Sequence, residues 1–456
     1  MSMMEYKVNL PVYRDVDVVV VGAGPAGIAA AVSAARNKAK VFVFDQWGCV
    51  GGMATMGGVG PFMNSFDSTG KNQIIRGIFE ELVERMKAMG GAIHPAEIGP
   101  ETSYSGYYKL GHNHVGPFDH EPFKIAAADM IKESGAELLL HTGFVDVIMK
   151  QNNIDGLVIS NKNGVSAVKA KVVIDCTGDG DVAFHSGEDF VLGREDGNVQ
   201  AATLFFRICN VNTEKLDAHI KEHADEIKPF FGPFSWLIRE RQKEWEGIHR
   251  GEVCLFQNPT AGEFRMNVTR ILNVDGTKAE DLTRAEIEGT RQATQAFNFL
   301  KKYAPGFENA SFMGTAATIG IRETRHVRGK YWLKGDEVEN CKVPGDSIAV
   351  FATNLDVHNK SNAAGTFIVL SKGPFFGVPY GCLVPEKTRN LLIAGRHISA
   401  DAVAASATRM IPCCIALGQA AGTAAALSLK RGIVPSQLNP KDLQSELRAA
   451  GVVVGF

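Results

Sequence analysis

The sequence predicts an α/β fold built on a parallel β-sheet, and three observations carry this prediction. The apolar run at residues 18–21 leads directly into a G-x-G-x-x-G motif at residues 22–27. An alanine-rich helix over 28–36 and a second apolar strand over 40–44 then follow. This order of strand, glycine turn, helix and strand is that of a βαβ unit, whose strands are parallel. A chain of 456 residues exceeds one compact core, so we expect at least two domains.

The glycine motif and the acid after the second strand indicate a dinucleotide site. Gly22 permits the tight turn, Gly24 lets the backbone approach a pyrophosphate, and Gly27 lets helix and strand pack closely. Asp45 ends the second strand, at a spacing where a carboxylate can accept hydrogen bonds from both ribose hydroxyls. A βαβ unit without a ligand is the alternative, but packing does not require this acid. The motif residues expected at the cofactor are Gly22, Gly24, Pro25, Ala26 and Gly27.

The residues after Asp45 indicate which dinucleotide is bound. A short loop leads to the glycine pair 51–52, and this pattern resembles the FAD-binding segment of the glutathione-reductase-like flavoprotein superfamily. In that superfamily the loop runs beside the pyrophosphate towards the isoalloxazine ring. The resemblance therefore implies FAD rather than NAD. It also implies cofactor contacts from Gln46, Gly51, Gly52, Met53 and Thr55.

Helices and strands alternate through the next part of the chain. Apolar residues at helical spacing predict a helix over 74–89, and another begins at Pro122 and ends before Gly135. Residues 92–118 predict a long covering loop, in which His112 and His114 have no third metal ligand nearby. Strand-like runs follow at 137–141, 144–149, 155–160, 165–171 and 172–176, the third and fourth forming a hairpin.

This order of segments also resembles the superfamily. There, a helix and a strand complete the FAD domain, and a β-meander follows. The resemblance implies that the strand near Val145 lies against the adenine. It also implies that the strand after the meander ends in a cofactor-binding turn, here Thr177, Gly178 and Asp179.

The pattern changes after residue 200. A strand is expected at 203–208, charged helical segments at 214–250, and a capping box at Thr283–Glu286 that opens a helix reaching about Tyr303. A strand at 390–395 and a final helix from about Pro412 return to the first domain. We therefore expect an FAD-binding domain over 1–200, an inserted α+β substrate domain over 201–378, and the C-terminal return over 379–456.

With these blocks in view, the chain resembles the bacterial FAD-dependent oxidoreductase family within that superfamily. The resemblance implies a Rossmann-like FAD domain with a parallel sheet and a β-meander, and redox chemistry at FAD. One departure stands out, because better-known relatives end the C-terminal strand in Gly-Asp and this chain has Gly395-Arg396. Gly395 and Arg396 are expected at the cofactor, and the first turn of the last helix, near Pro412, is expected to face the flavin. The motifs that carry the match are 51–55, 268–270, 275–277, 305–309, 320–325, 356–359, 378–385, 390–396, Ser399, Arg409 and 416–422.

Hydride transfer to a flavin usually needs a proton acceptor and anchors for a polar substrate. His358, between Asp356 and Asn359, and His397, after Gly395-Arg396, are the two histidine candidates for proton transfer. The alternative is that both are buried histidines whose ring nitrogens have hydrogen-bond partners in the core. Arg322 and Arg325 are the candidate substrate anchors, and a structural ion-pair cluster is their alternative reading. No metal site is expected.

Composition narrows the location and the partners. A net charge of −2 without a basic stripe argues against nucleic acid. The apolar segment 411–429 contains Gly, Gln, Thr and Ser, so a buried helix is preferred to a membrane span. Residues 1–14 lack the pattern of a secretory signal, and eight scattered cysteines indicate a reduced, cytoplasmic protein. We expect a small-molecule substrate and an unidentified electron partner, and leave a homo-oligomer open.

The leading functional hypothesis is an FAD oxidoreductase that acts on a small polar organic substrate. It would dehydrogenate a C–C or C–O bond, or reduce an activated double bond. A flavin-dependent hydratase or isomerase without net redox change is one alternative. A non-enzymatic binding protein that retains the FAD fold is the other.

Overall fold

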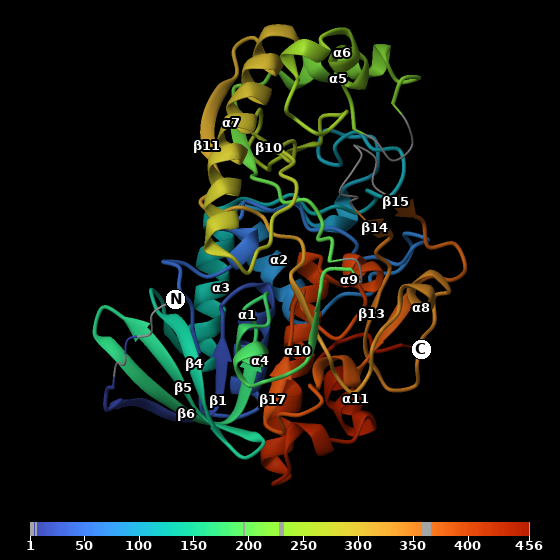
Figure 1. The fold of residues 1–456 in the computed structure, drawn as a ribbon. Coiled ribbons are helices and arrows are strands. Elements are labelled where there is room, and N and C mark those ends of the chain that lie inside the picture. Colours follow the sequence, from blue (N-terminus) through green and yellow to red (C-terminus); the bar gives the residue numbers. More distant parts are fainter. Residues whose placement is uncertain (1–3, 5–6, 195–196, 228–231, 358–365, 456) are drawn as a thin grey trace.

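The computed structural model describes residues 4, 7–194, 197–227, 232–357 and 366–455. It has two lobes (Figure 1). The sheet lobe carries a large β-sheet with its helices. The cap lobe, residues 201–321 as far as they are described, lies above it and carries a smaller sheet under a long helix.

The large sheet has a parallel half and an antiparallel half, as the sequence predicts. The parallel strands lie in the order β3 (Glu137–Leu139), β2 (Val41–Phe44), β1 (Val12–Val21), β6 (Gly164–Asp175) and β17 (Leu391–Ile393). The meander adds β5 (Asn153–Asn161), which pairs antiparallel with the first half of β6, and β4 (Gly143–Lys150), which pairs antiparallel with β5. The two strands predicted at 165–171 and 172–176 are therefore one continuous strand.

Alternation along β1 assigns its two faces. Val18 and Val20 belong to the core beneath the helices, whereas Val19 and Val21 belong to the core beneath the meander and α4 (Asp181–His185). Because successive strand residues point to opposite faces, an unbroken run of valines fits a strand that is buried on both sides. The α/β fold class is thus confirmed.

Helix α1 (Pro25–Arg36) and helix α10 (Ile411–Lys430) pack side by side beneath the sheet. A Cβ atom at Gly418 would lie 2.0 Å from the Ala26 carbonyl oxygen, and one at Gly422 would lie 2.2 Å from that of Ala30. These two glycines therefore bring α10 into close contact with α1. Within the described residues, α10 is the helix long and apolar enough to cross a membrane, and it is wholly buried. The buried-helix prediction is confirmed.

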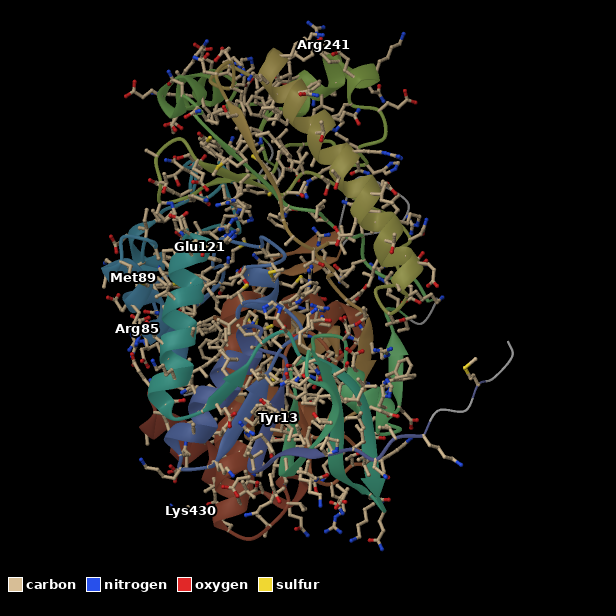
Figure 2. All side chains as sticks on the ribbon, turned by 90° about the vertical axis from the view of Figure 1, so that its left-hand side faces the viewer. Tyr13, Arg85, Met89, Glu121, Arg241 and Lys430 are labelled. Carbon is tan, nitrogen blue, oxygen red and sulfur yellow. The ribbon has the colours of Figure 1, made fainter. Side chains whose placement is uncertain are left out.

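Helices α2 (Ile78–Ala88) and α3 (His120–Ser134) cover the outer side of α1. Figure 2 faces this side, where Arg85 of α2 forms a 2.6 Å ion pair with Glu133 of α3. The remaining elements of the sheet lobe are α8 (Gly335–Glu339), α9 (Ala402–Thr408), α11 (Pro440–Ala449) and three two-stranded sheets: β7 (Phe190–Leu192) with β12 (Arg325–Val327), β13 (Ser347–Phe351) with β16 (Phe376–Pro379), and β14 (Leu355–Val357) with β15 (Thr366–Ile368).

The cap lobe has its own core. Its sheet runs in the order β11 (Ser311–Thr315), β8 (Phe206–Cys209), β10 (Phe264–Met266) and β9 (Leu255–Gln257). It packs with α5 (Thr213–Glu222), α6 (Ser235–Glu240) and α7 (Ala279–Tyr303). Apolar residues from Leu333 to Val378 pack in the sheet-lobe core instead, where β13 contacts α10 and α11. The cap therefore ends near residue 321, well before the predicted boundary at 378.

The capping box predicted at Thr283 is wrong. Helix α7 begins earlier, at Ala279, and the Thr283 hydroxyl donates to the Ala279 carbonyl at 2.8 Å inside the helix. The Glu286 carboxylate accepts the N–H of Ile319 at 2.6 Å. Helix α7 therefore runs through the site where a local cap was expected, and Glu286 takes part in a tertiary contact instead.

Candidate functional site

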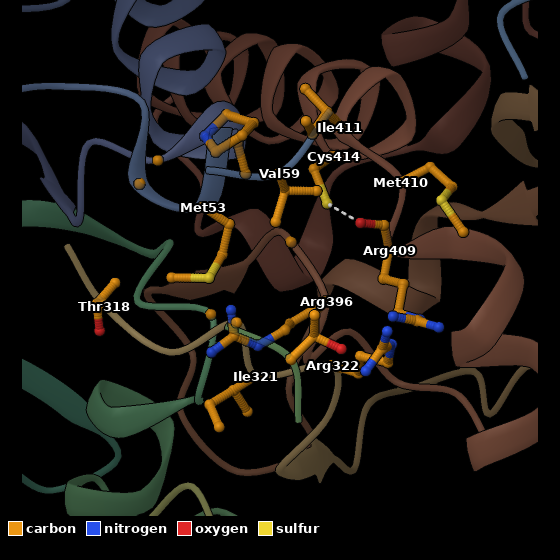
Figure 3. A pocket seen from close by; sticks show the side chains of 18 of the residues that line it. Met53, Val59, Thr318, Ile321, Arg322, Arg396, Arg409, Met410, Ile411 and Cys414 are labelled. Atoms are coloured by element: carbon orange, nitrogen blue, oxygen red, sulfur yellow. Dashed lines mark hydrogen bonds between the residues drawn. The ribbon is translucent and has the colours of Figure 1, made fainter. Parts of the chain in front are cut away.

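A cavity of about 880 Å³ lies between the two lobes. One part, which we call the dinucleotide groove, follows the ends of β1, β2 and β6. The other part, the arginine chamber, is shown in Figure 3 and receives side chains from both lobes. Groove residues include Val21, Gly22, Gly24, Pro25, Ala26, Asp45, Gln46, Val145, Thr177, Gly178 and Asp179. Chamber residues include Met53, Val59, Thr318, Ile321, Arg322, Arg396, Arg409, Met410, Ile411 and Cys414.

The glycine turn fits a pyrophosphate. Gly22 has φ +95°, and a Cβ there would lie 2.6 Å from the Cys176 carbonyl oxygen, so only glycine suits this position. Gly24 is the N-cap of α1, and Pro25 follows at its first turn. The first N–H groups of a helix have no partner within the helix, and the first residues of α1 line the groove. The turn therefore offers backbone donors and no competing side chain.

Asp45 is held in position by backbone donors. Its side chain accepts the N–H of Ala23 at 2.6 Å and that of Trp47 at 2.9 Å. Burial raises the pKa of this carboxyl above its ordinary value, and these hydrogen bonds oppose the shift. An ionised carboxylate has about four acceptor sites, so it keeps acceptor capacity for the ribose beside these backbone donors. This geometry fits the role expected from the sequence.

The opposite wall of the groove explains the unusual Gly395-Arg396 pair. The Asp179 carboxylate accepts Arg396 Nη2 at 2.5 Å and the Thr324 hydroxyl at 2.7 Å. Asp179 follows β6, Arg396 follows β17, and Thr324 precedes β12. Where relatives place an acid, this chain places a cation that is bound to an acid from the neighbouring turn.

The first turn of α10 lines the chamber, as expected. Met410, Ile411 and Cys414 face the cavity, whereas Pro412 does not line it. The Cys414 thiol donates to the Arg409 carbonyl at 3.4 Å, drawn as a dashed line in Figure 3. Burial raises the pKa of Cys414 to about 12, so this group remains a thiol near neutral pH. The positive end of a 20-residue helix thus borders the chamber.

Four predicted cofactor residues shape the groove without lining it. A Cβ at Gly27 would lie 1.8 Å from the Gly22 carbonyl oxygen, so this glycine serves packing. The N–H of Gly51 bonds to Ala23, and the Thr55 hydroxyl to Val50, both at 2.8 Å. Pro412 is buried within α10. The other predicted cofactor residues line the cavity: Gly22, Gly24, Pro25, Ala26, Asp45, Gln46, Gly52, Met53, Val145, Thr177, Gly178, Asp179, Gly395 and Arg396.

The structure separates the four catalytic candidates. His358 lies outside the described residues. His397 was expected to face the flavin, but it is 1% exposed, does not line the cavity, and has its Nε2 3.5 Å from Asp175. Because it points inward from the loop after β17, it is a core histidine. Burial lowers its pKa and keeps it neutral. Arg322 lines the chamber.

Arg325 is a structural cation. It forms a 2.8 Å ion pair with Asp181, donates to the Asp179 carbonyl at 2.9 Å, and lies over the Phe184 ring. Burial and the neighbouring Asp179 raise the pKa of Asp181 to about 6, and Arg325 opposes this shift. Arg325 does not line the cavity. The substrate role considered for it is therefore replaced by the ion-pair alternative.

Several lining residues were not among the sequence predictions. Arg270 and Arg409 reach the cavity from the cap lobe and from the segment before α10. Both stand in or beside motifs that carry the family resemblance, which was the available signal. Tyr108 and His112 line the cavity from the covering loop, and their ring centroids are 4.0 Å apart. The metal pair considered at His112 and His114 is not formed, because His114 instead stacks on Phe66.

Comparison with known proteins assigns the family. Residues 17–447 match the family described as FAD dependent oxidoreductase, so this chain belongs to it. The match spans both lobes and the segments that line the groove and the chamber. FAD is therefore the cofactor, and the predictions of FAD and of an oxidoreductase are confirmed. The non-enzymatic alternative is set aside.

Individual relatives are more distant. A thiamine thiazole synthase from Methanococcus maripaludis is 31% identical over 180 residues, which are 38% of this chain and 59% of that protein. One from Aeropyrum pernix is 30% identical over 202 residues, or 41% and 62% of the two chains. These matches thus cover less than two thirds of either relative.

Two of the solved structures that match this chain span almost its whole length. The p-nitrophenol 4-monooxygenase of Pseudomonas putida has a TM-score of 0.49 and 10% identity, covering 95% of this chain and 83% of that one. A geranylgeranyl bacteriochlorophyll reductase-like protein of Thermoplasma acidophilum has a TM-score of 0.46 and 14% identity, covering 96% and 84%.

Proposed function

We propose that this enzyme transfers a hydride between FAD and a small polar organic substrate bound in the arginine chamber. The reaction would dehydrogenate a C–C or C–O bond or reduce an activated double bond. The observation that carries this proposal is the continuity of the dinucleotide groove with a chamber lined by polar and cationic side chains of both lobes. FAD supplies the hydride chemistry, and the chain supplies position and electrostatics.

The chain's own groups suit these tasks. The N-terminus of α10 favours negative charge at the end of the chamber nearest Met410 and Ile411. Arg322 and Arg409 line the same chamber and can bind polar substrate atoms. His397 is removed as a proton acceptor by its burial, so His358 stays the histidine prediction for that role. The meander and the glycine turn support placement in the glutathione-reductase-like superfamily.

An anaerobic screen tests the proposal. Purified holoenzyme is mixed with small alcohols, acids and activated alkenes, and the flavin absorbance is followed. A substrate in the oxidative direction should bleach the oxidised flavin stoichiometrically, and one in the other direction should restore the colour of the reduced flavin. A compound that is converted without any change in flavin redox state would contradict hydride transfer and favour the hydratase or isomerase.

We also propose a cytoplasmic location, a small-molecule substrate, no nucleic-acid or membrane partner, and an electron partner distinct from NADH. The composition and the single G-x-G-x-x-G motif support these proposals. Cell fractionation tests the location. Rapid reduction by NADH or NADPH, at about 10 per second, would contradict the proposal on the electron partner.

A further inference from the structure

Two histidines and a glutamate share the last turn of α5 in the cap lobe, outside the cavity between the lobes. Helix α5 ends at Glu222, His223 is its C-cap, and His219 lies one turn earlier. Side chains three and four positions apart lie on one face of a helix, so the three converge. One ligand atom from each lies within 4.8 Å of the others. This set of donors is of the kind that binds a divalent metal ion.

A hydrogen bond fixes the tautomer of His223. Its Nδ1 lies 3.0 Å from the His219 carbonyl oxygen, which can only accept, so Nδ1 is the N–H donor. The lone pair of the neutral ring is therefore on Nε2. The ring also stacks on Trp236 of α6, with centroids 4.8 Å apart and planes at 4°. A backbone acceptor on the second ring nitrogen is typical of metal-binding histidines, because it fixes both tautomer and orientation.

The other members of the group also favour a cation. The ring centroids of His219 and His223 are 4.4 Å apart. Burial and the neighbouring His223 lower the pKa of His219, so its imidazole is neutral near neutral pH, as a metal ligand must be. The C-terminal end of a helix carries partial negative charge, and Glu222 adds an exposed carboxylate there.

A second cluster, of Glu80, Glu84 and His94, provides a contrast. Its ligand atoms also lie within 4.8 Å of one another. There, His94 Nδ1 accepts the N–H of Ala96 at 3.1 Å, so the ring proton is on Nε2, which lies 3.2 Å from Glu80. Both nitrogens of His94 are thus used within the fold. The ring of His223 keeps a lone pair for a ligand, so the group on α5 is the better metal site.

The same part of α5 holds the covering loop. The Tyr107 hydroxyl donates to Asp217 at 2.6 Å. Lys109 Nζ donates at 2.6 Å to the carbonyl of Ala224, the residue that follows His223. Tyr108, between these two contacts, lines the cavity. A cation that fixes the end of α5 is therefore coupled to the loop segment that carries Tyr108.

We propose that His219, Glu222 and His223 bind a redox-inert divalent metal ion of the zinc class, which stabilises the cap lobe and the covering loop. Imidazole nitrogens with one carboxylate favour Zn²⁺ over Mg²⁺ and Ca²⁺, which prefer oxygen ligands. Bonds from zinc to nitrogen are about 2 Å long, so rotation of the three side chains closes the group around the ion. The site revises the sequence expectation of no metal. It is independent of the proposed hydride transfer, because its residues lie outside the cavity lining.

Titration of the holoenzyme with zinc chloride, after removal of any affinity tag, tests the site. Calorimetry should show one saturable zinc site per chain, and magnesium chloride should not compete for it. His219→Ala and His223→Ala should each weaken zinc binding by roughly 10- to 100-fold or more, since loss of a mere partner of a ligand already costs that much. Glu222→Gln should weaken it less, because one oxygen remains.

Two substitutions serve as matched controls. Glu84→Gln changes an exposed carboxylate of the second cluster, and His249→Ala removes an exposed histidine outside both clusters. Both should leave the zinc affinity unchanged. Flavin content and melting temperature without zinc are measured for every variant. His223→Gln keeps a planar group on Trp236 and replaces His223→Ala if the alanine variant does not fold.

Hydrogen exchange measures the link to the covering loop. Zinc should slow exchange of the amides of residues 107–109 in the wild type and should have no such effect in His223→Ala. Lys109→Ala should keep the zinc affinity and lose part of this protection. Unchanged zinc affinity in both histidine variants, or equal affinity for magnesium, would overturn the site. Zinc binding that leaves exchange of the loop unchanged would overturn its coupling to the covering loop.

Discussion

The two parts of the cavity are built on different principles. The dinucleotide groove uses backbone groups, and its central side chain, Asp45, is itself held by backbone donors. The arginine chamber uses long cationic side chains. Their hydrogen bonds reach residues far away in the sequence, such as that from Arg409 to Gln200. The groove is therefore rigid because of close backbone packing. The chamber is defined by side chains and their hydrogen bonds.

This difference shows how one scaffold can retain a cofactor while its substrate changes. A Cβ atom added at Gly22 or Gly27 would lie 2.6 Å or 1.8 Å from a carbonyl oxygen, so it cannot be accommodated without moving a strand or a helix. A substitution in the chamber changes a charge or a hydrogen bond and leaves the packing in place. Variants in the two parts should thus fail in different ways, which the following predictions address.

The largest effect is expected at the glycine turn. Gly27→Ala places a Cβ 1.8 Å from the Gly22 carbonyl oxygen, so α1 must move away from β1. Overpacking of this severity should lower the free energy of unfolding by about 3 kcal/mol or more and abolish flavin binding. Melting curves and flavin content measure this.

Gly24→Ala is the matched control, because the nearest atom to its added Cβ is 4.0 Å away. This variant should keep the stability of the apoprotein and lose FAD affinity, since only the approach of the pyrophosphate is obstructed. A Gly27→Ala protein with wild-type stability and full flavin content would contradict the view that the groove is more closely packed than the chamber.

Asp45 should give the next largest effect. Asp45→Ala removes the acceptor expected for both ribose hydroxyls and should cost about 3–6 kcal/mol of FAD binding. It also leaves the N–H groups of Ala23 and Trp47 without their acceptor, so stability falls as well. Asp45→Asn keeps one acceptor oxygen, so its FAD affinity should lie between those of the wild type and Asp45→Ala. Fluorescence titration of apoprotein with FAD is the measurement, and wild-type affinity in the alanine variant would exclude the ribose contact.

Asp179 lies in the dinucleotide groove and Arg396 in the arginine chamber, so their ion pair joins the two parts of the cavity. We expect an effect of intermediate size on FAD binding. Single and double substitutions, Asp179→Asn and Arg396→Gln, form a cycle whose interaction energy in FAD binding should be about 1 kcal/mol. The reason is their 2.5 Å contact on a wall that is partly exposed. An interaction energy near zero would show that the groove and the chamber are energetically independent.

The smallest effect concerns His397 and pH. Burial lowers its pKa, and Asp175 at 3.5 Å opposes the shift. The unfolded chain therefore binds this proton more readily, and stability is lost as the pH falls below about 6.5. His397→Gln should flatten the decline in the free energy of unfolding between pH 7 and 5. Once a substrate is known, its flavin half-reaction should keep the wild-type pH profile, whereas a loss of about 100-fold would restore His397 as a catalytic group.

The groove was predictable from sequence because its determinants are local. Gly22, Gly24 and Asp45 lie within one βαβ unit, and each position has one geometric task. The chamber was not predictable to the same degree. Arg322 and Arg409 lie far apart in the sequence and meet through Gln200 and Ala201, which no local pattern reveals. His397 illustrates the same limit, since its position after Gly395 does not determine whether the side chain points inward or outward.

The contact between α1 and α10 fixes the position of one helix along the other. Ala26 meets Gly418 and Ala30 meets Gly422, so the helices run in parallel and in fixed register. Helix α10 starts seven residues before Gly418, whereas α1 starts one residue before Ala26. At 1.5 Å per residue, the N-terminus of α10 therefore extends about 9 Å beyond that of α1. Two positive helix ends are thereby held at a set spacing along the cavity, one where the diphosphate is predicted and one where the flavin ring is predicted. A ligand is selected by its length, so FMN, which lacks the diphosphate and the adenosine, should compete poorly with FAD for the apoprotein.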